Sequence, residues 1–179
     1  MKLIVVPKVA ICKRLDELGF ERAIPLINNP KSGERSIGIW PDSKKPALPN
    51  CHGTTCYVTR TEDTIVSDPF NLEGGDYLFA GPGPGYIHHP AMKKFLSRSC
   101  TQLDITDQDY EGDFRGAIVG VWDEDLLQHT AIALGKISGV PWFFHQENVG
   151  EKFDLVTLTE ILRDYPYDLK FYMPPTAMA

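Results

Sequence analysis

The sequence lacks several features that would point to familiar classes of protein. No hydrophobic run approaches the about 20 residues that a membrane-spanning helix needs. Positive charge is not in excess, because the formal net charge is −6, and nucleic-acid binders neutralise phosphates with Lys and Arg. A Walker loop, a glycine-framed serine and a Gly-x-Gly-x-x-Gly motif after a first strand are also missing. We therefore expect neither a membrane nor a nucleic acid as a partner.

Cysteine is scarce, with Cys12, Cys51, Cys56 and Cys100 as the full set of 4. A chain of 179 residues can bury a core without covalent staples, so reduced structural thiols are expected. Cys51 and Cys56, with His52 between them, lack the second close pair that a closed zinc site requires. The sequence therefore predicts no metal and no cofactor.

The first residues carry one Lys and then four apolar residues, Leu3 to Val6. A secretory signal needs an apolar stretch about twice that length. We interpret residues 3–6 as a buried first strand and expect a cytoplasmic protein.

The pattern of elements predicts an α/β fold. Apolar runs typical of buried strands lie at 77–80, 116–122, 141–145 and 169–173, and helices are expected at 9–18, 90–97, 124–137 and 153–164. Shorter β-like runs lie at 36–40, 55–59 and 64–66. Because strands that alternate with long helices form βαβ units, we expect a small doubly wound, mostly parallel sheet over residues 76–173. Residues 1–75 would be a β-rich N-terminal extension within a single domain, 1–179.

The first candidate site is the loop from Gly81 to His89, because ligands of open α/β sheets bind beyond the carboxyl ends of the strands. Its glycines, Gly81, Gly83 and Gly85, let a ligand approach the backbone, and the helix expected from Pro90 offers N–H groups to an anion. His88 and His89 can bind phosphate or shuttle a proton. The alternative is a tight turn with exposed histidines.

Two further candidates follow later strands. Asp123 and Asp125 stand at an expected helix start, where they either cap the helix or act as a base and hold ribose hydroxyls. His145 and Glu147 lie at the carboxyl end of the strand 141–145, where they are either acid/base groups or part of a surface loop.

Cys51 beside His52 suggests a nucleophile with its base. Adjacent residues of an extended chain point to opposite faces, so we predict that these two side chains do not pair.

Residues 77–145 resemble nucleoside 2-deoxyribosyltransferase-like proteins. The resemblance is carried by Tyr77-Leu78-Phe79-Ala80-Gly81-Pro82 and by the segment from Gly116 to Pro141, with its buried strand, acidic turn and alanine-rich stretch. It implies cleavage or transfer of an N-glycosidic bond through a glutamate, whose matching position lies near Ala131. A second resemblance, of His52-Gly53-Thr54 to a strand of the ADP-ribosyltransferases, implies an NAD-dependent enzyme in a different fold.

The leading hypothesis is therefore a nucleotide- or nucleoside-binding protein that cleaves or transfers a glycosidic bond. Gly81, Gly83, Gly85, His88, His89 and Asp125 would bind the ligand, and Glu147, His145 and Asp123 would be catalytic. The rival is an acidic protein without catalysis, an inhibitor or assembly component, with a protein partner on Tyr165, Tyr167, Phe171 and Tyr172. Aromatic residues are typical of interface cores, although these four can equally close the core.

Overall fold

The computed structural model describes residues 8–39, 45–67, 77–79, 83–104 and 114–175. Its helices are α1 (Lys8–Glu17), α2 (Ala23–Asn28), the 3-10 helix η1 (Pro30–Glu34), α3 (Cys51–Val58), α4 (Glu62–Ser67), α5 (His89–Arg98) and α6 (Leu158–Asp164). Its strands are β1 (Gly38–Ile39), β2 (Pro46–Ala47), β3 (Tyr77–Leu78), β4 (Tyr86–Ile87), β5 (Thr101–Gln102), β6 (Ile118–Asp123), β7 (Leu126–Ile137), β8 (Val140–Gln146), β9 (Phe153–Thr157) and β10 (Asp168–Met173). The expected first strand at 3–6 lies outside the described residues.

The central sheet is antiparallel, so the prediction of a mostly parallel doubly wound sheet is wrong. Six strands pair in the order β5-β10-β6-β7-β8-β9, and every neighbouring pair runs antiparallel. The error lies mainly in residues 124–137, which form the turn after β6 and the long strand β7 instead of a helix. Ser138 and Gly139, both with positive φ, close the hairpin between β7 and β8.

Where the structure describes residues 1–75 they are mainly helical, with the short pair of strands β1 and β2, which corrects the expected β-rich extension. Residues 55–59 fall largely in α3 and residues 64–66 in α4. The segment 153–164 divides into strand β9 and helix α6, which begins where the Thr157 hydroxyl accepts a hydrogen bond from the Glu160 N–H. The expected helices at 9–18 and 90–97 are confirmed as α1 and α5, and the strand at 116–122 is confirmed as β6.

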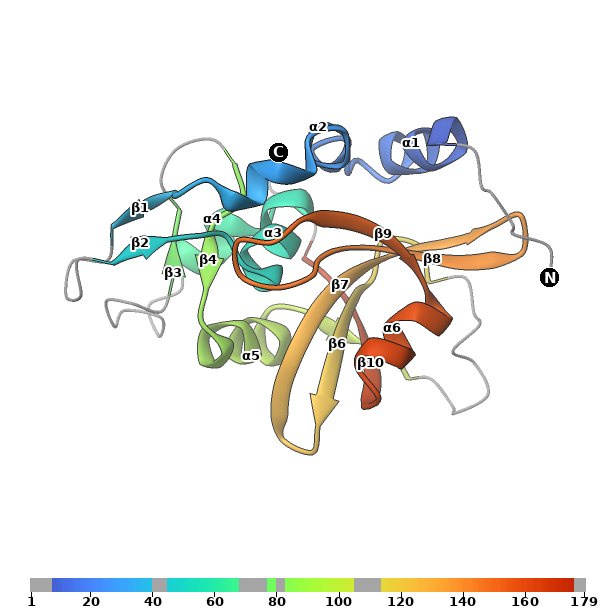
Figure 1. Ribbon diagram of the computed structural model, residues 1–179. Coiled ribbons are helices and arrows are strands. Elements are labelled where there is room, and N and C mark those ends of the chain that lie inside the picture. Colours follow the sequence, from blue (N-terminus) through green and yellow to red (C-terminus); the bar gives the residue numbers. More distant parts are fainter. Residues whose placement is uncertain (1–7, 40–44, 68–76, 80–82, 105–113, 176–179) are drawn as a thin grey trace.

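Helices cover both faces of the sheet (Figure 1). On one face, side chains of α1, α2 and α3 pack on Ile132, Leu134 and Phe144. Helices α4 and α5 extend this layer over Ile118 and Leu127. On the opposite face, α6 packs on alternate residues of β6 to β9 and β10. Because β7 is covered on both sides, its side chains are nearly all buried, and it has no polar face.

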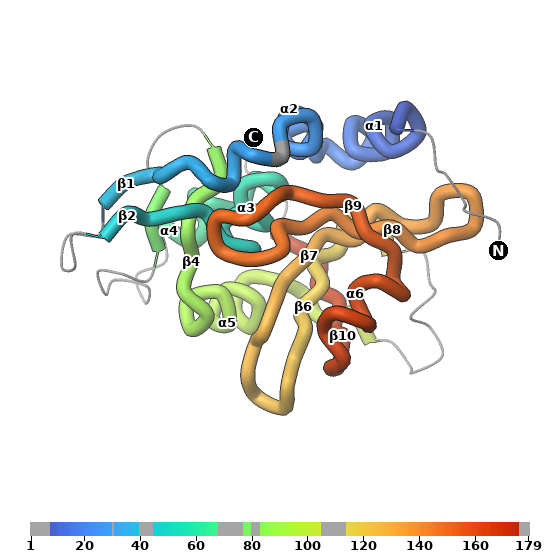
Figure 2. The backbone as a smooth tube through the Cα atoms, in the orientation of Figure 1, coloured from blue at the N-terminus to red at the C-terminus, as the bar shows by residue number. Residues whose placement is uncertain are grey.

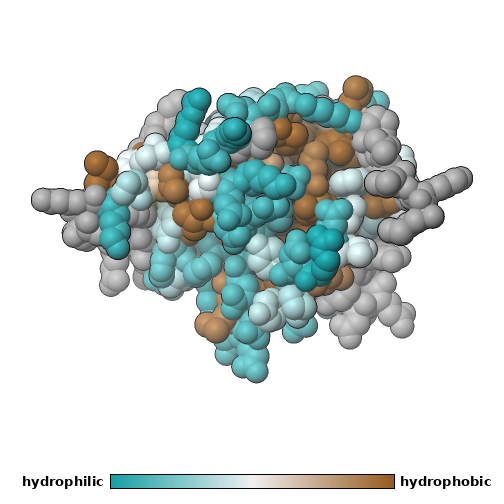
Figure 3. All heavy atoms as spheres, viewed as in Figure 1, coloured by the Kyte–Doolittle hydropathy of each residue, from teal (hydrophilic) through white to brown (hydrophobic). Residues whose placement is uncertain are grey.

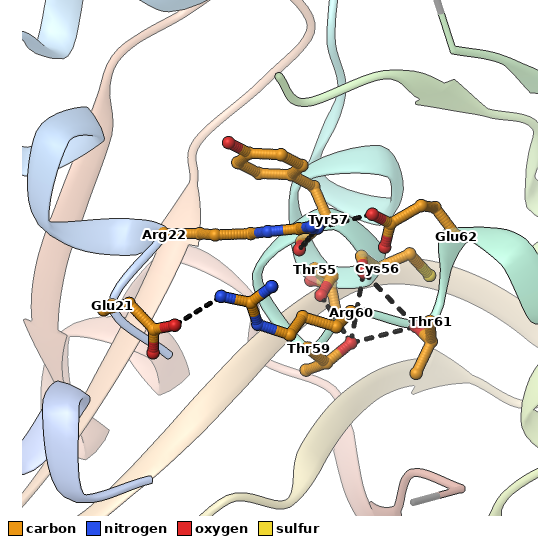
Figure 4. A network of polar contacts seen from close by, with 9 residues as sticks. All are labelled: Glu21, Arg22, Thr55, Cys56, Tyr57, Thr59, Arg60, Thr61 and Glu62. Carbon is orange, nitrogen blue, oxygen red and sulfur yellow. Dashed lines mark hydrogen bonds and ion pairs between the residues drawn. The ribbon is translucent and has the colours of Figure 1, made fainter. Parts of the chain in front are cut away.

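The segment before α2 is anchored to the C-terminal end of α3 by a polar network (Figure 4). The Arg22 guanidinium lies over the Tyr57 ring at 4.8 Å from its centroid, donates to the Tyr57 carbonyl at 3.0 Å and pairs with Glu62. Arg60, which has positive φ, pairs with Glu21. These contacts attach the end of α3 and the start of α4 to the segment before α2, and so help to fix the orientation of α3.

Hydrophobic side chains that remain exposed come from distant elements, such as Val9, Ile39 and Leu126, and Figure 3 shows hydrophobic atoms at several places on the viewed face. The aromatic residues near the C-terminus differ in exposure. Phe171 and Tyr172 are buried in the core, whereas Tyr167 is 41% exposed.

Two leucines of β7 test the packing of the sheet. Leu134 is fully buried between the sheet and α1, so Leu134→Ala should lower the free energy of unfolding by about 2–5 kcal/mol. Leu126 is 64% exposed on the same strand, so Leu126→Ala should change it by less than about 0.5 kcal/mol. Urea denaturation measures both, and equal effects would contradict the described register.

Candidate active site

Helix α3 is capped by Asn50, whose side chain joins it to strand β4. The Asn50 Oδ1 atom accepts hydrogen bonds from the N–H groups of Gly53 (2.9 Å) and Ile87 (3.0 Å), and Nδ2 donates to the Ile87 carbonyl at 2.7 Å. The Asn50 N–H also donates to the Gly85 carbonyl at 3.2 Å. Asn50 therefore caps the helix and pairs with β4 as a neighbouring strand would, which fixes the first turn of α3.

The thiol of Cys51 lies at the first residue of α3 and is only 7% exposed. Hydrogen bonding from Thr130 on β7 acts on this thiol, and its sulfur lies 3.6 Å from Nδ1 of His52. The prediction that Cys51 and His52 do not pair is wrong, because residues 51–58 are helical instead of extended. A helix start with its partial positive charge is a site where a thiolate is stabilised.

Two histidines from neighbouring strands form a pair beside this helix. Nε2 of His129, on β7, lies 2.8 Å from Nδ1 of His145, on β8, and the two rings meet edge to face. Tyr165, which follows α6, stacks on the His129 ring at 4.3 Å between centroids. The Tyr165 hydroxyl donates to the Glu147 carbonyl at 2.8 Å, so the ring that covers His129 is itself held in place.

Two observations relate His129 to Cys51. Hydrogen bonding from Thr130, the residue that directly follows His129, acts on the Cys51 thiol. Cys51 also acts electrostatically on Tyr165, the ring that stacks on His129. Nε2 of His129 is bonded to His145, so Nδ1 is the ring nitrogen that remains for another partner.

Further polar contacts lock α3 onto the sheet, and Figure 2 shows these parts of the chain side by side despite their distance in sequence. The Thr54 hydroxyl donates to Oε1 of Gln146 on β8 at 2.8 Å, and Gln146 Nε2 donates to the Glu151 carbonyl at 3.0 Å. The hydroxyls of Thr55 and Thr130 lie 3.2 Å apart. These side chains are buried, and each is hydrogen-bonded, as buried polar groups must be for a stable fold.

A second histidine pair lies on the other side of Cys51. Nδ1 of His52 is 2.8 Å from the Thr130 hydroxyl, and its Nε2 is 2.7 Å from Nδ1 of His89, the first residue of α5. His52 is completely buried, whereas His89 is exposed. The pair therefore connects the start of α3 with the protein surface.

Burial keeps these groups neutral. It raises the pKa of the Cys51 thiol to about 11, and hydrogen bonds from the backbone and side chain of Thr130 and from the backbone of His52 oppose that rise. Burial also lowers the pKa of His145 to about 4 and holds the pKa of His52 and of His129 well below the ordinary value. At neutral pH the sulfur is therefore a thiol and the imidazoles are uncharged.

The predicted ligand loop is only partly assembled into a site. Gly81 lies outside the described residues. Gly83 has a φ of +139° and borders, with Pro84 and Arg35, a cavity of about 340 Å³. Gly85 is needed for packing, because a Cβ there would overlap the Leu78 carbonyl oxygen and the Phe79 ring.

The two predicted histidines of this loop lie at the start of α5. His88 is its exposed N-cap residue, and His89 is the partner of His52 described above. The ring centroids of His88 and His89 are 6.0 Å apart.

The remaining residues that were predicted to form a site lie in different parts of the structure. Asp123 ends β6, and Asp125 lies in the β6–β7 turn, where its carbonyl accepts a hydrogen bond from Lys93 at 2.9 Å, so neither caps a helix. His145 is in the site, bonded to His129. Glu147 follows β8, and its carboxylate lies 3.7 Å from the Lys152 ammonium.

The grouping of Cys51 with His129 and His145 was not predicted from the sequence. Two patterns in the sequence could have indicated it. The segment Asn50-Cys51 matches a cap residue followed by a helix start, and Gly139 lies between two apolar runs that each carry a histidine. Read as a hairpin, these runs place His129 and His145 on neighbouring strands.

No described group of three or more His, Cys, Asp or Glu side chains has the geometry to hold a metal ion. Among the described residues, no helix is long and apolar enough to cross a membrane. The chain matches no protein-family model, no curated protein and no solved structure.

The buried histidines predict a loss of stability in mild acid. The pKa of His145 is lowered in the folded state, so between about pH 6.5 and 4 the unfolded chain binds the extra proton and stability falls as pH falls. From pH 7 to 5, His145 alone should cost roughly 2 kcal/mol. Urea titrations should therefore show a smaller acid loss for His145→Gln than for the unaltered protein. Equal losses in both proteins would contradict a neutral, buried His145.

Proposed function

We propose that the protein is a cysteine-dependent acyl-transfer enzyme, a hydrolase of amides or esters, with Cys51 as its nucleophile. The observation that carries the proposal is the 2.8 Å bond between His129 and His145, which lie on two strands in contact with the helix that begins at Cys51. A nucleophile, a base within reach and a third group that orients the base are the shared features of such enzymes on unrelated folds. His129 is the proposed base, and His145 orients it.

In the acylation step, Nδ1 of His129 removes the thiol proton while the Cys51 sulfur attacks the carbonyl carbon of the substrate. The carbon–nitrogen or carbon–oxygen bond then breaks, and His129 returns the proton to the leaving amine or alcohol. Water attacks the resulting thioester in the second step, gives one proton to His129 and releases a carboxylic acid, and the thiol is restored. Both steps balance without an oxidant, a metal or a cofactor.

Backbone N–H groups at the start of α3 support the oxyanion that forms during each attack. The first N–H groups of a helix have no acceptor within it, and here Asn50 satisfies the N–H of Gly53 while the helix continues from Cys51. A donor placed where negative charge develops contributes about 100- to 1,000-fold to the rate.

The nucleotide or nucleoside ligand expected from the sequence stays a prediction. Its topological basis, the carboxyl ends of parallel strands, does not apply to an antiparallel sheet, and Asp123 and Asp125 lie at the end of β6 and in the turn that follows it. The non-catalytic rival also stays a prediction, although the pairing of His129 with His145 has no role in it.

The test is acylation by an activated ester, 4-nitrophenyl acetate, followed by intact-mass and peptide mass spectrometry. We expect one acetyl group on Cys51, none on Cys51→Ala, and a rate lower by about 100-fold or more in His129→Asn, because the base is lost. Cys12→Ser is the matched control, since Cys12 is a half-buried thiol on α1 and should leave the rate unchanged.

Acylation of another residue, or an unchanged rate in Cys51→Ala, would refute the proposal. If His129→Asn reacts normally and His52→Asn does not, the base is His52, whose Nδ1 also lies near the sulfur.

A further inference from the structure

The pair of His52 and His89 has no part in the acyl-transfer mechanism above, yet it reaches the sulfur of Cys51. Nδ1 of His52 lies 3.6 Å from that sulfur and 2.8 Å from the Thr130 hydroxyl, while its Nε2 lies 2.7 Å from Nδ1 of His89. A fully buried imidazole with both nitrogens in short contacts can adopt only tautomers that suit both partners.

The two neutral tautomers of His52 have opposite effects on the nucleophile. With the proton on Nδ1, His52 donates toward the sulfur and the Thr130 hydroxyl, and so stabilises a thiolate. With the proton on Nε2, the lone pair of Nδ1 faces the sulfur, and His52 competes with His129 for the thiol proton. The choice depends on whether His89 donates to Nε2 or accepts from it.

We propose that His89 is a positioning residue that donates from Nδ1 to His52, and that His52 thereby presents its Nδ1–H to the Cys51 sulfur. The inference rests on the proposed function. It is supported by the other hydrogen bonding at the sulfur, from the backbone and side chain of Thr130 and from the backbone of His52 and Cys51, all of which lowers the pKa of the thiol as donors do. The Thr130 hydroxyl, 2.8 Å from Nδ1 of His52, can accept from the same N–H, and it lies 3.2 Å from the Thr55 hydroxyl.

The surroundings keep His52 neutral, as this role requires. Burial lowers its pKa well below the ordinary value, and the nearby His89 and His88 add to the effect. The other titratable groups that face the pair are Cys51 on the same helix and His129 on β7.

Isosteric variants of His89 separate the two tautomers. His89→Asn keeps a group that can donate near the position of Nδ1, whereas His89→Asp offers only acceptors and forces the proton of His52 onto Nε2. The readout is the rate at which iodoacetamide alkylates Cys51, followed by peptide mass spectrometry between pH 6 and 9. His88→Asp is the matched control, because it places the same charge on the adjacent exposed residue, which has no described hydrogen bond to His52.

We expect His89→Asp to lower the alkylation rate by about tenfold, the effect of one hydrogen bond to a charged group. His89→Asn and His88→Asp should stay within about threefold of the unaltered protein. Equal rates for His89→Asn and His89→Asp would overturn the inference, whether both are fast or both are slow, and would leave the proposed function intact. If 4-nitrophenyl acetate does not acetylate Cys51 in the unaltered protein, the proposed function is refuted instead.

A second measurement needs no variant of His89. Nitrogen-15 spectra of histidine-labelled protein report which ring nitrogen carries the proton, with the His52 signals assigned from His52→Asn. A proton on Nδ1 supports the inference, and a proton on Nε2 overturns it even if Cys51 proves unreactive.

Discussion

The contact between helix α3 and strand β7 is the constraint on which the site depends. The first turns of α3 carry polar side chains, including His52, Thr54 and Thr55, that are buried against the sheet. A buried polar group is costly unless it is hydrogen-bonded, so each side chain must meet its partner on β7 or β8. An apolar helix could slide along the sheet with little change in contact. Helix α3 cannot slide without breaking these hydrogen bonds. The Cys51 sulfur is therefore held beside Thr130.

The same burial sets the resting charges of the site. Removing water raises the pKa of the thiol and lowers that of the surrounding imidazoles, so both burial effects oppose an ion pair. Transfer of the proton from sulfur to His129 then has to accompany attack on the substrate, as it does in serine hydrolases. Donors at the sulfur, the Thr130 N–H and the start of α3, lower the cost of that transfer but do not complete it in the free protein.

The elements predicted correctly from sequence were those with one strong pattern, such as the amphipathic helix α1 and the apolar strand β6. Residues 126–137 were misread because Ala, Leu, Gln and Lys favour helices, and a strand buried on both faces shows no alternation. Residues 55–59, which fall largely in α3, were misread in the opposite sense. Their Thr, Cys, Tyr and Val favour strands by fractions of a kcal/mol, which the Asn50 cap and the packing of Gly53 against the Gly85 backbone outweigh.

The candidate site shows the same limit. His145 and His89 were singled out from sequence, but their partners, His129 and His52, were not paired with them. Each pair joins segments whose closeness follows from the sheet order and from the docking of α3, which local patterns do not contain. A turn motif can be recognised from a few adjacent residues, whereas a contact between residues 37 positions apart, as for His52 and His89, requires the correct topology.

The orientation of His145 limits how His129 can act. For His129 to accept a proton at Nδ1, its Nε2 must carry a proton and donate to Nδ1 of His145, which leaves the His145 proton on Nε2. That atom is buried without a hydrogen-bond partner among the described residues. A neutral imidazole stabilises an imidazolium less than a carboxylate does, so His129 would hold its extra proton only briefly. The pair thus favours immediate transfer to the leaving group over a stored thiolate–imidazolium pair, in keeping with the neutral resting state of the site.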